Sequence, residues 1–166
     1  MWYGGIDPGT KGGLVVIDDQ SLIHFKIHFR DYMQFCLDFK AMLEDPVIGP
    51  NDDIYFVLED VHSLFGMSAK SNFNFGYIKG FKACMLMFSE VKYSFVRPKA
   101  WQKVIWTAAD IRLNDKGKKD TKATSLNAAN RLFPGEDFLA TSRSRIPHDG
   151  LVDGALMAEY CRIISN

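Results

Sequence analysis

The sequence has little of the chemistry that marks several protein classes. It contains three cysteines and four histidines in 166 residues, and its apolar runs are far shorter than a membrane span. An odd number of separated cysteines favours reduced core thiols over disulfides or a zinc site. His24 and His28 lack a partner ligand pattern, so they are interpreted as surface or core histidines. No basic segment followed by an apolar one opens the chain, so we expect a cytoplasmic protein without membrane association.

Net charge is also absent, because 20 Lys and Arg residues balance 20 Asp and Glu residues. A neutral chain by itself argues against a nucleic-acid partner. The distribution of charge points the other way, since residues 92–145 carry a net +7 and the remainder carries −7. This segment is a candidate surface for phosphate groups. The alternative is an ordinary solvated face, because the stretch NDKGKKDTK at 114–122 also contains acids.

The apolar pattern predicts a single α/β domain over residues 1–166, and 47% apolar residues suffice for a core. Strands are predicted at 2–6, 14–18, 21–29, 52–60 and 92–98. Helices are predicted at 31–45, 72–91, 99–106, 121–133 and 148–164, and loops at 61–71, 107–119 and 134–147. Three successive strands followed by alternating strands and helices predict a five-stranded mixed sheet. Its first three strands are antiparallel, the last two are parallel, and helices cover both faces.

Acidic residues fall at the ends of the predicted elements. Asp7 ends the first strand, Glu59 ends the fourth, and Asp149 and Asp153 lie one turn apart on the last helix. Clustered carboxylates are costly to desolvate, so they imply a divalent cation. Oxygen ligands with few histidines favour Mg²⁺ or Mn²⁺. The alternatives are structural: Asp7 caps its turn, Asp149 complements the helix dipole, and Glu59 is an ordinary exposed residue at a strand end.

Five segments extend this pattern over nearly the whole chain. They are GIDPGTKGG at 5–13, FVLEDVHSLFG at 56–66 with SNFNFGYIKG at 71–80, VRPKAWQK at 96–103, KKDTKATSLNAANRLFP at 118–134, and HDGLVDGALMA at 148–158. In order and spacing the sequence resembles RuvC-type Holliday junction resolvases, particularly their small phage and organellar branch. The resemblance implies a ribonuclease H-like fold, a homodimer, and Mg²⁺-dependent nicking of paired strands across a four-way DNA junction in recombination. For a phage protein, the compartment would be the host cytoplasm.

By position in these motifs, the resemblance identifies Asp7 as the first-strand acid, Glu59 as the central-strand glutamate and Asp153 as the final-helix aspartate. The expected chemistry uses two divalent ions about 4 Å apart, which activate a water and stabilise the leaving 3′ oxygen. The predicted metal ligands are Asp7, Glu59, Asp149 and Asp153.

One position departs from the bacterial pattern. Bacterial members usually carry an aspartate three residues before the last one, where this chain has Gly150. The acid here is Asp149, preceded by His148, and either residue is a candidate to complete the metal site or to handle a proton. The missing side chain at Gly150 is expected to leave space for His148 or a water.

Basic and aromatic residues are the candidate DNA contacts. Lys119 and Lys122 are candidates for holding the transition-state phosphate, with a simple backbone contact as the alternative. Phe73 and Phe75 are expected to stack on unpaired bases or to pack in the core or a dimer interface. The complete set of predicted contacts is Phe73, Phe75, Lys99, Lys103, Lys118, Lys119 and Lys122.

Other functions remain open at this stage. The DPGT stretch at 7–10 also resembles the phosphate loop of sugar kinases and actin-like ATPases, but those enclose ATP between two domains, so no nucleotide cofactor is expected. A ribonuclease H-like nuclease acting on flaps or hybrids, and a junction-binding protein without cleavage, are the remaining alternatives.

Overall fold

The computed structural model describes residues 1–48, 54–61, 66 and 68–165. The five strands are β1 (Trp2–Ile6), β2 (Gly13–Ile17), β3 (Ile23–His28), β4 (Ile54–Glu59) and β5 (Lys92–Val96). They form one sheet in the order β3-β2-β1-β4-β5. The β1–β2 and β2–β3 pairs are antiparallel, whereas β1–β4 and β4–β5 are parallel. This arrangement confirms the predicted mixed sheet.

The helices also follow the predicted order. They are α1 (Tyr32–Leu43), α2 (Ala69–Phe88), α3 (Pro98–Ile105), α4 (Thr121–Leu132) and α5 (Asp149–Ser165), with a short 3₁₀ helix η1 (Ala108–Asp110). Asp31, Ser68 and Asp120 cap α1, α2 and α4, because each side chain accepts a hydrogen bond from a backbone N–H in the first turn.

Two details differ from the sequence-based expectation. Helix α2 begins three residues earlier than predicted, because Ser68 supplies its cap. The predicted loop at 107–119 contains η1 and an isolated β-bridge between Leu113 and Lys119. Of the predicted loop at 61–71, residues 62–65 and 67 lie outside the described residues.

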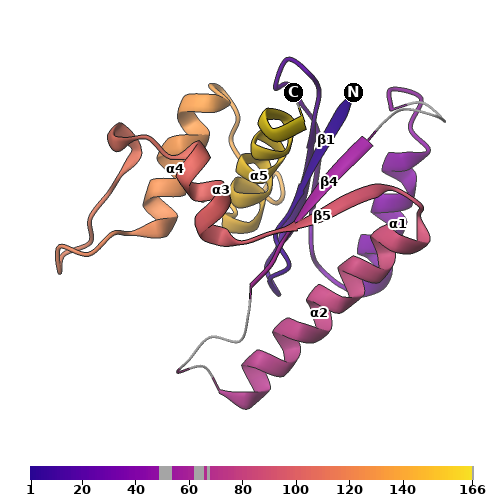
Figure 1. Ribbon diagram of the computed structural model, residues 1–166, viewed down its shortest axis with the longest axis horizontal. Coiled ribbons are helices and arrows are strands. Elements are labelled where there is room, and N and C mark those ends of the chain that lie inside the picture. The colour runs from indigo at the N-terminus through magenta and orange to yellow at the C-terminus, as the bar shows by residue number, and fades with distance from the viewer. Residues whose placement is uncertain (49–53, 62–65, 67, 166) are drawn as a thin grey trace.

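Helices cover both faces of the sheet (Figure 1). Helices α1 and α2 pack on one face, around a core that includes Phe35, Phe39 and Phe56. Helices α3, α4 and α5 lie on the other face, around a core that includes Trp101 and Leu156. Helix α5 is buried along most of its length because it lies between the sheet and the other two helices, which explains why apolar residues occupy nearly all its sides.

Glycines allow α5 to approach β1 closely. A Cβ atom on Gly5 would lie 2.0 Å from the carbonyl oxygen of Gly154, and one on Gly154 would lie 3.3 Å from the carbonyl oxygen of Gly5. The helix backbone therefore crosses the strand almost in contact with it. This crossing brings the first two turns of α5 next to the end of β1.

The cysteines are all free thiols, as expected, but only Cys161 is fully buried. Cys84 is exposed on α2, so its prediction as a core residue is wrong. Trp101 is buried. Within the described residues, no helix combines the length and apolar character needed to cross a membrane.

Candidate functional site

Two carboxylates meet at one edge of the sheet. The parallel register pairs Ile6 of β1 with Leu58 of β4, so the next residues, Asp7 and Glu59, lie side by side at the strand ends. Burial raises the pKa of Glu59, and the negative charge of the neighbouring Asp7 raises it further. The sequence prediction that these two acids share a site is consistent with this geometry.

The Asp7 side chain caps the β1–β2 turn and is also partly buried. Its Oδ1 accepts a hydrogen bond from the backbone N–H of Gly9 at 2.8 Å, so the proposed turn-capping role is present. Burial nevertheless raises the pKa of Asp7, and the Gly9 hydrogen bond and the Lys82 charge only partly oppose it. Turn capping therefore explains the position of one carboxylate oxygen but not the burial of the charged group, which disfavours an unpaired anion.

Glu59 is oriented by a tryptophan. The indole Nε1–H of Trp101 donates to Glu59 Oε1 at 2.9 Å. Burial raises the pKa of Glu59 to about 7, and the charges of Asp7 and Asp153 act in the same direction. The alternative that Glu59 is an ordinary exposed residue at a strand end is therefore wrong.

Asp153 reaches the same site from α5. Burial raises its pKa to about 7, with a contribution from the charge of Asp7 and an opposing hydrogen bond from Ser125 on α4. Its Oδ1 atom is buried and has no hydrogen-bond partner within the described residues. A buried carboxylate oxygen without a donor is costly, so this atom is suited to a cation or a proton.

Asp149 lies at the start of α5 and is more exposed than the sequence suggests. Its Oδ2 atom lies 2.5 Å from Lys122 Nζ of α4, and its side chain is 56% exposed. Asp149, Asp153 and Lys122 line a common cavity of about 280 Å³. The two aspartates therefore face one space, but Asp149 stands at its open side.

His148 precedes α5 and lies close to the acids. Its electrostatic interaction with Asp7 partly opposes the rise that burial causes in the Asp7 pKa, and its ring lies 5.9 Å from that of His28. Its Nδ1 atom is buried without a hydrogen-bond partner among the residues that the structure describes. The imidazole is therefore available to a ligand or a proton.

The expectation that Gly150 leaves free space is wrong. A Cβ atom there would lie 2.4 Å from the carbonyl oxygen of Lys11 and 2.6 Å from the carbonyl carbon of Gly12. Gly12 and Gly150 also form a β-bridge. The backbone of the β1–β2 turn fills the position, so no side chain fits at 150 and the nearby acid must come from residue 149.

The two aromatics predicted to stack on bases or to pack in the core lie on different sides of α2. Phe73 and Phe75 both lie on α2, and two residues on a helix are about 200° apart. Phe73 is 73% exposed and stacks at 6.5 Å on Tyr77, whereas Phe75 is half-buried. The exposed aromatic pair is thus Phe73 and Tyr77, which a search for i, i+4 aromatics would have found.

The predicted basic contacts divide into two places. Lys122 lies at the acidic cavity, whereas Lys99, Lys103 and Lys119 line a separate groove of about 590 Å³. Lys118 is exposed in the segment before α4. Lys119 and Lys122 therefore lie in different places, although the sequence made both candidates for holding the transition-state phosphate.

Sequence reasoning missed Lys82, a fully buried lysine in the apolar part of α2. Its Nζ donates to the backbone carbonyl of Asp7 at 2.7 Å and lies 5.0 and 4.9 Å from the ring centroids of Phe29 and Phe35. A charged residue within the apolar stretch GFKACML was the available signal.

The donor set suits a hard divalent cation, although the side chains are held apart. In the described part of the chain, no three His, Cys, Asp or Glu side chains are arranged to hold a metal ion. Asp7, Glu59 and Asp149 each engage a protein partner instead. The unpartnered Oδ1 of Asp153 and the raised pKa values of the buried acids nevertheless fit a bound cation.

Solved structures identify the architecture. Thermus thermophilus RuvC in complex with a Holliday junction substrate superposes with a TM-score of 0.56, covering 95% of this chain and 90% of that one at 15% identity. The chain has the RuvC fold. A second Thermus thermophilus RuvC structure gives a TM-score of 0.55, covering 95% of this chain and 91% of that one at 14% identity.

The RuvC fold thus extends over nearly the full length of both chains. No protein-family model and no curated protein sequence matches the chain. The likeness is therefore one of structure, and it confirms the ribonuclease H-like architecture that the motifs predicted.

Proposed function

We propose that this protein is a divalent-metal-dependent endonuclease that resolves four-way DNA junctions by paired nicks. The observation that carries the proposal is that Asp7, Glu59 and Asp153 lie near enough to the end of β1 to interact electrostatically, in a RuvC fold. Burial raises the pKa of all three carboxylates, and the charges of neighbouring acids add to the rise, so the fold alone gains nothing from placing them here.

In the proposed site, Asp7, Glu59, Asp153 and Asp149 hold two Mg²⁺ ions, for which Mn²⁺ can substitute. Such ions activate a water and neutralise charge on a phosphodiester as it is cleaved. The chain's own residues supply orientation. Trp101 fixes one oxygen of Glu59, and the turn N–H of Gly9 fixes one oxygen of Asp7.

Lys122 and His148 are the proposed auxiliary groups. Lys122 lies at the open side of the acidic cavity, where its ammonium group can meet a phosphate oxygen once it leaves Asp149. His148 presents a buried Nδ1 without a partner among the described residues, so it can accept or donate a proton near the acids.

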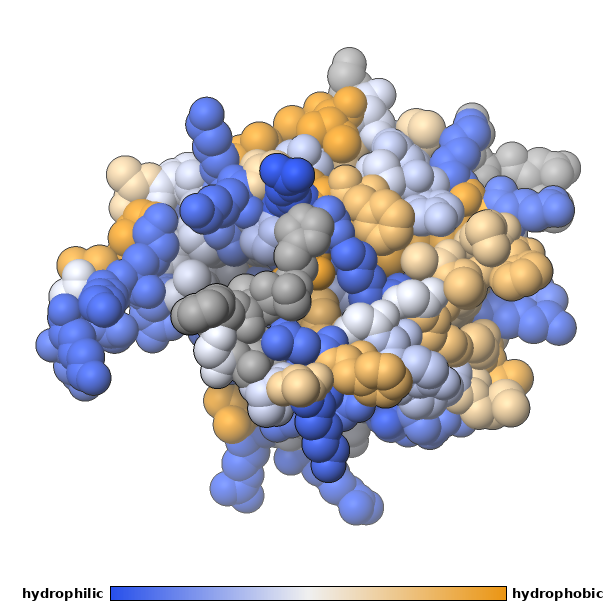
Figure 2. All heavy atoms as spheres, turned by 60° about the horizontal axis from the view of Figure 1, so that its bottom comes forward, coloured by the Kyte–Doolittle hydropathy of each residue, from blue (hydrophilic) through white to orange (hydrophobic). Residues whose placement is uncertain are grey.

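The paired nicks require two copies of the site, and we propose a homodimer. Helices α1 and α2 expose Met33, Leu37 and Phe88, and a groove of about 410 Å³ runs between them, lined in part by Phe39 and Phe81. Figure 2 shows hydrophobic side chains gathered on the right, the side where α1 and the end of α2 lie in Figure 1. A two-fold contact over such a face would bury apolar surface and match a symmetric junction.

The test incubates the protein with a synthetic four-way junction, a flap and an RNA–DNA hybrid in Mg²⁺, with light scattering to measure the oligomeric state. Symmetric nicks in the junction by a dimer would support the proposal. Preferential cutting of the flap or the hybrid would favour another ribonuclease H-like nuclease. Junction binding without cleavage in Mg²⁺ or Mn²⁺ would instead indicate a binding protein.

A further inference from the structure

A basic groove lies beside the acidic cavity and is distinct from it. Its volume is about 590 Å³, and helix α3, η1 and the start of α4 form its walls. The cations come from Lys99 and Lys103, one turn apart on α3, and from Lys119 across the groove. The remaining lining residues are Gln102, Trp106, Thr107, Ala108, Ile111 and Thr121. None of them is acidic.

The lysines of this groove are not neutralised by the protein. Among the described residues, no carboxylate forms an ion pair with Lys99, Lys103 or Lys119, in contrast to Lys122, which pairs with Asp149. Lys119 Nζ lies 5.2 Å from the centroid of the Trp106 ring instead. An aromatic face positions an ammonium group without cancelling its charge, so the groove keeps its attraction for anions.

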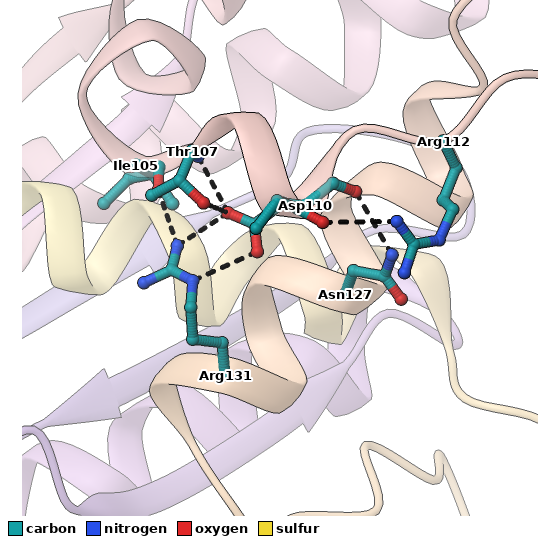
Figure 3. Close-up of polar contacts among 7 residues, drawn as sticks. Ile105, Thr107, Asp110, Arg112, Asn127 and Arg131 are labelled. Carbon is teal, nitrogen blue, oxygen red and sulfur yellow. Dashed lines mark hydrogen bonds and ion pairs between the residues drawn. The ribbon is translucent and has the colours of Figure 1, made fainter.

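An ion pair between Arg131 and the buried Asp110 carboxylate holds the walls of the groove together (Figure 3). Arg131 of α4 donates through Nε and an Nη atom to both carboxylate oxygens of Asp110, at 3.0 and 2.8 Å, and also to the carbonyl of Ile105 at the end of α3. The same carboxylate accepts hydrogen bonds from the backbone N–H and hydroxyl of Thr107. Asn127 donates to the Asp110 carbonyl.

This network fixes α3 and η1 on α4. The hydrogen bonds from Arg131 lower the pKa of Asp110 to about 2 against the opposing effect of burial, so the pair stays ionised across the physiological pH range. The lysines of α3 are thereby held at a constant position relative to α4.

Helix α4 also connects the groove to the acids. Thr121, its first residue, lines the groove, and the next residue, Lys122, lines the acidic cavity with Asp149 and Asp153. A polymer of phosphates lying across the first turn of α4 would reach both places. In Figure 2, hydrophilic side chains project at the left edge, where the segment between η1 and α4 lies in Figure 1.

We infer that the groove binds the phosphate backbone of a duplex DNA arm beyond the point of cleavage. The inference rests on the proposed function for the identity of the polyanion. The groove would then act as a second anchor at a fixed separation from the acids, and phosphate contacts of this kind position a duplex without reading its sequence.

The test measures binding to a four-way junction in EDTA, where cleavage cannot interfere. The groove variant is Lys99→Gln with Lys103→Gln. The matched control is Lys26→Gln with Arg30→Gln, which removes the same charge from β3 and the segment that follows it, outside both the 92–145 segment and the α1–α2 groove. We expect the groove variant to lower the slope of log affinity against log salt by about 2, about one for each lost phosphate contact. The Arg variants of Lys99 and Lys103 should restore the slope.

A second measurement locates the contact on the DNA. A short window of uncharged methylphosphonate linkages is moved along one arm of the junction. At one window position, we expect wild-type affinity to fall on the order of tenfold and the groove variant to lose little more, because both changes remove the same contact. The control variant should lose affinity at that window as wild type does.

Strictly additive effects at every window, or an unchanged salt slope in the groove variant, would overturn the inference. Since binding is measured without metal, these outcomes are independent of whether the protein cleaves. Absence of cleavage with a groove-dependent arm contact would contradict the nuclease proposal and leave the groove in place.

Discussion

The Lys82 ammonium group donates a hydrogen bond of 2.7 Å to the backbone carbonyl of Asp7, from a position with no exposed surface. The side chain thus links α2, on one face of the sheet, to the strand end that carries the first acid. Burial lowers the pKa of Lys82 to about 8, and the negative charge of Asp7 opposes that change. A cation in this place holds the Asp7 turn and offsets part of the repulsion among the acids.

We therefore expect Lys82→Met to lower the single-turnover cleavage rate at least tenfold. The apolar side chain fills the aromatic surroundings, but it leaves the Asp7 carbonyl without its donor. Thermal stability should change little, because losing a buried charge offsets the lost hydrogen bond. The cleavage rate of Lys82→Gln, which keeps a hydrogen-bond donor, should lie between those of wild type and Lys82→Met. Wild-type cleavage by Lys82→Met would contradict this role.

Each of Asp7→Asn, Glu59→Gln and Asp153→Asn should abolish metal-dependent cleavage and preserve junction binding. These substitutions remove proposed metal ligands and leave the phosphate contacts intact. Cleavage assays and binding in EDTA separate the two effects. If all three variants lost folding or binding together, the acids would have a structural role instead.

Stability without metal should decrease as the pH rises. The folded-state pKa values of Glu59 and Asp153 are about 7, above the ordinary values of 4.5 and 3.8. An acid whose pKa is raised by folding contributes its full stability at a pH below its unfolded pKa. This contribution is lost as the pH rises toward and through 7. One kcal/mol corresponds to about 2–4 °C in a domain of this size. We expect the melting temperature to fall by about 5 °C or more between pH 5 and pH 7.5.

The Glu59→Gln and Asp153→Asn variants are the controls for this pH effect, because neither amide titrates. Each should flatten the pH dependence of the melting temperature. Adding Mn²⁺ at pH 7.5 should raise the wild-type melting temperature more than that of either variant. A melting temperature independent of pH from 5 to 7.5 would show that these acids do not resist ionisation.

Substitutions distinguish the roles of Asp149 and His148. If Asp149 is a metal ligand, Asp149→Asn should reduce cleavage by orders of magnitude and raise the Mg²⁺ requirement. His148→Ala should mainly change the pH dependence of the rate, because the imidazole is the candidate proton carrier beside the acids. The opposite result, an active Asp149→Asn and an inactive His148→Ala, would assign the metal site to the histidine.

Gly150→Ala should be strongly destabilising, by several kcal/mol on the scale of severe overpacking. The new Cβ would meet the backbone of Lys11 and Gly12, which cannot move aside as a flexible side chain can. The matched control is Gly76→Ala on α2, where no atom lies within 4 Å of the new Cβ. That change should be neutral or stabilise the helix by about 0.5–1 kcal/mol. Urea denaturation measures the free energy of unfolding of both variants. Equal values would contradict the predicted clash at residue 150.

The sequence by itself determined the strand and helix order, because apolar periodicity reports which faces of each element are buried. It also made Asp7, Glu59 and Asp153 candidates for the site, since acids at the ends of buried strands and on the apolar side of a helix are unusual enough to be noticed. The β1–β2 turn is a local feature, and it too could be predicted from neighbouring residues, whereas the Ser68 cap of α2 was missed.

Only the tertiary structure decided what lies around those residues. The closure of the space at Gly150 depends on the turn of β1 and β2 packing against α5, which are more than 130 residues apart in the chain. The hydrogen bond from Lys82 to Asp7, the partner of Glu59 and the separation of Lys119 from Lys122 likewise depend on how distant segments pack. Local patterns specify what each segment buries, but contacts between segments arise only when the sheet brings them together.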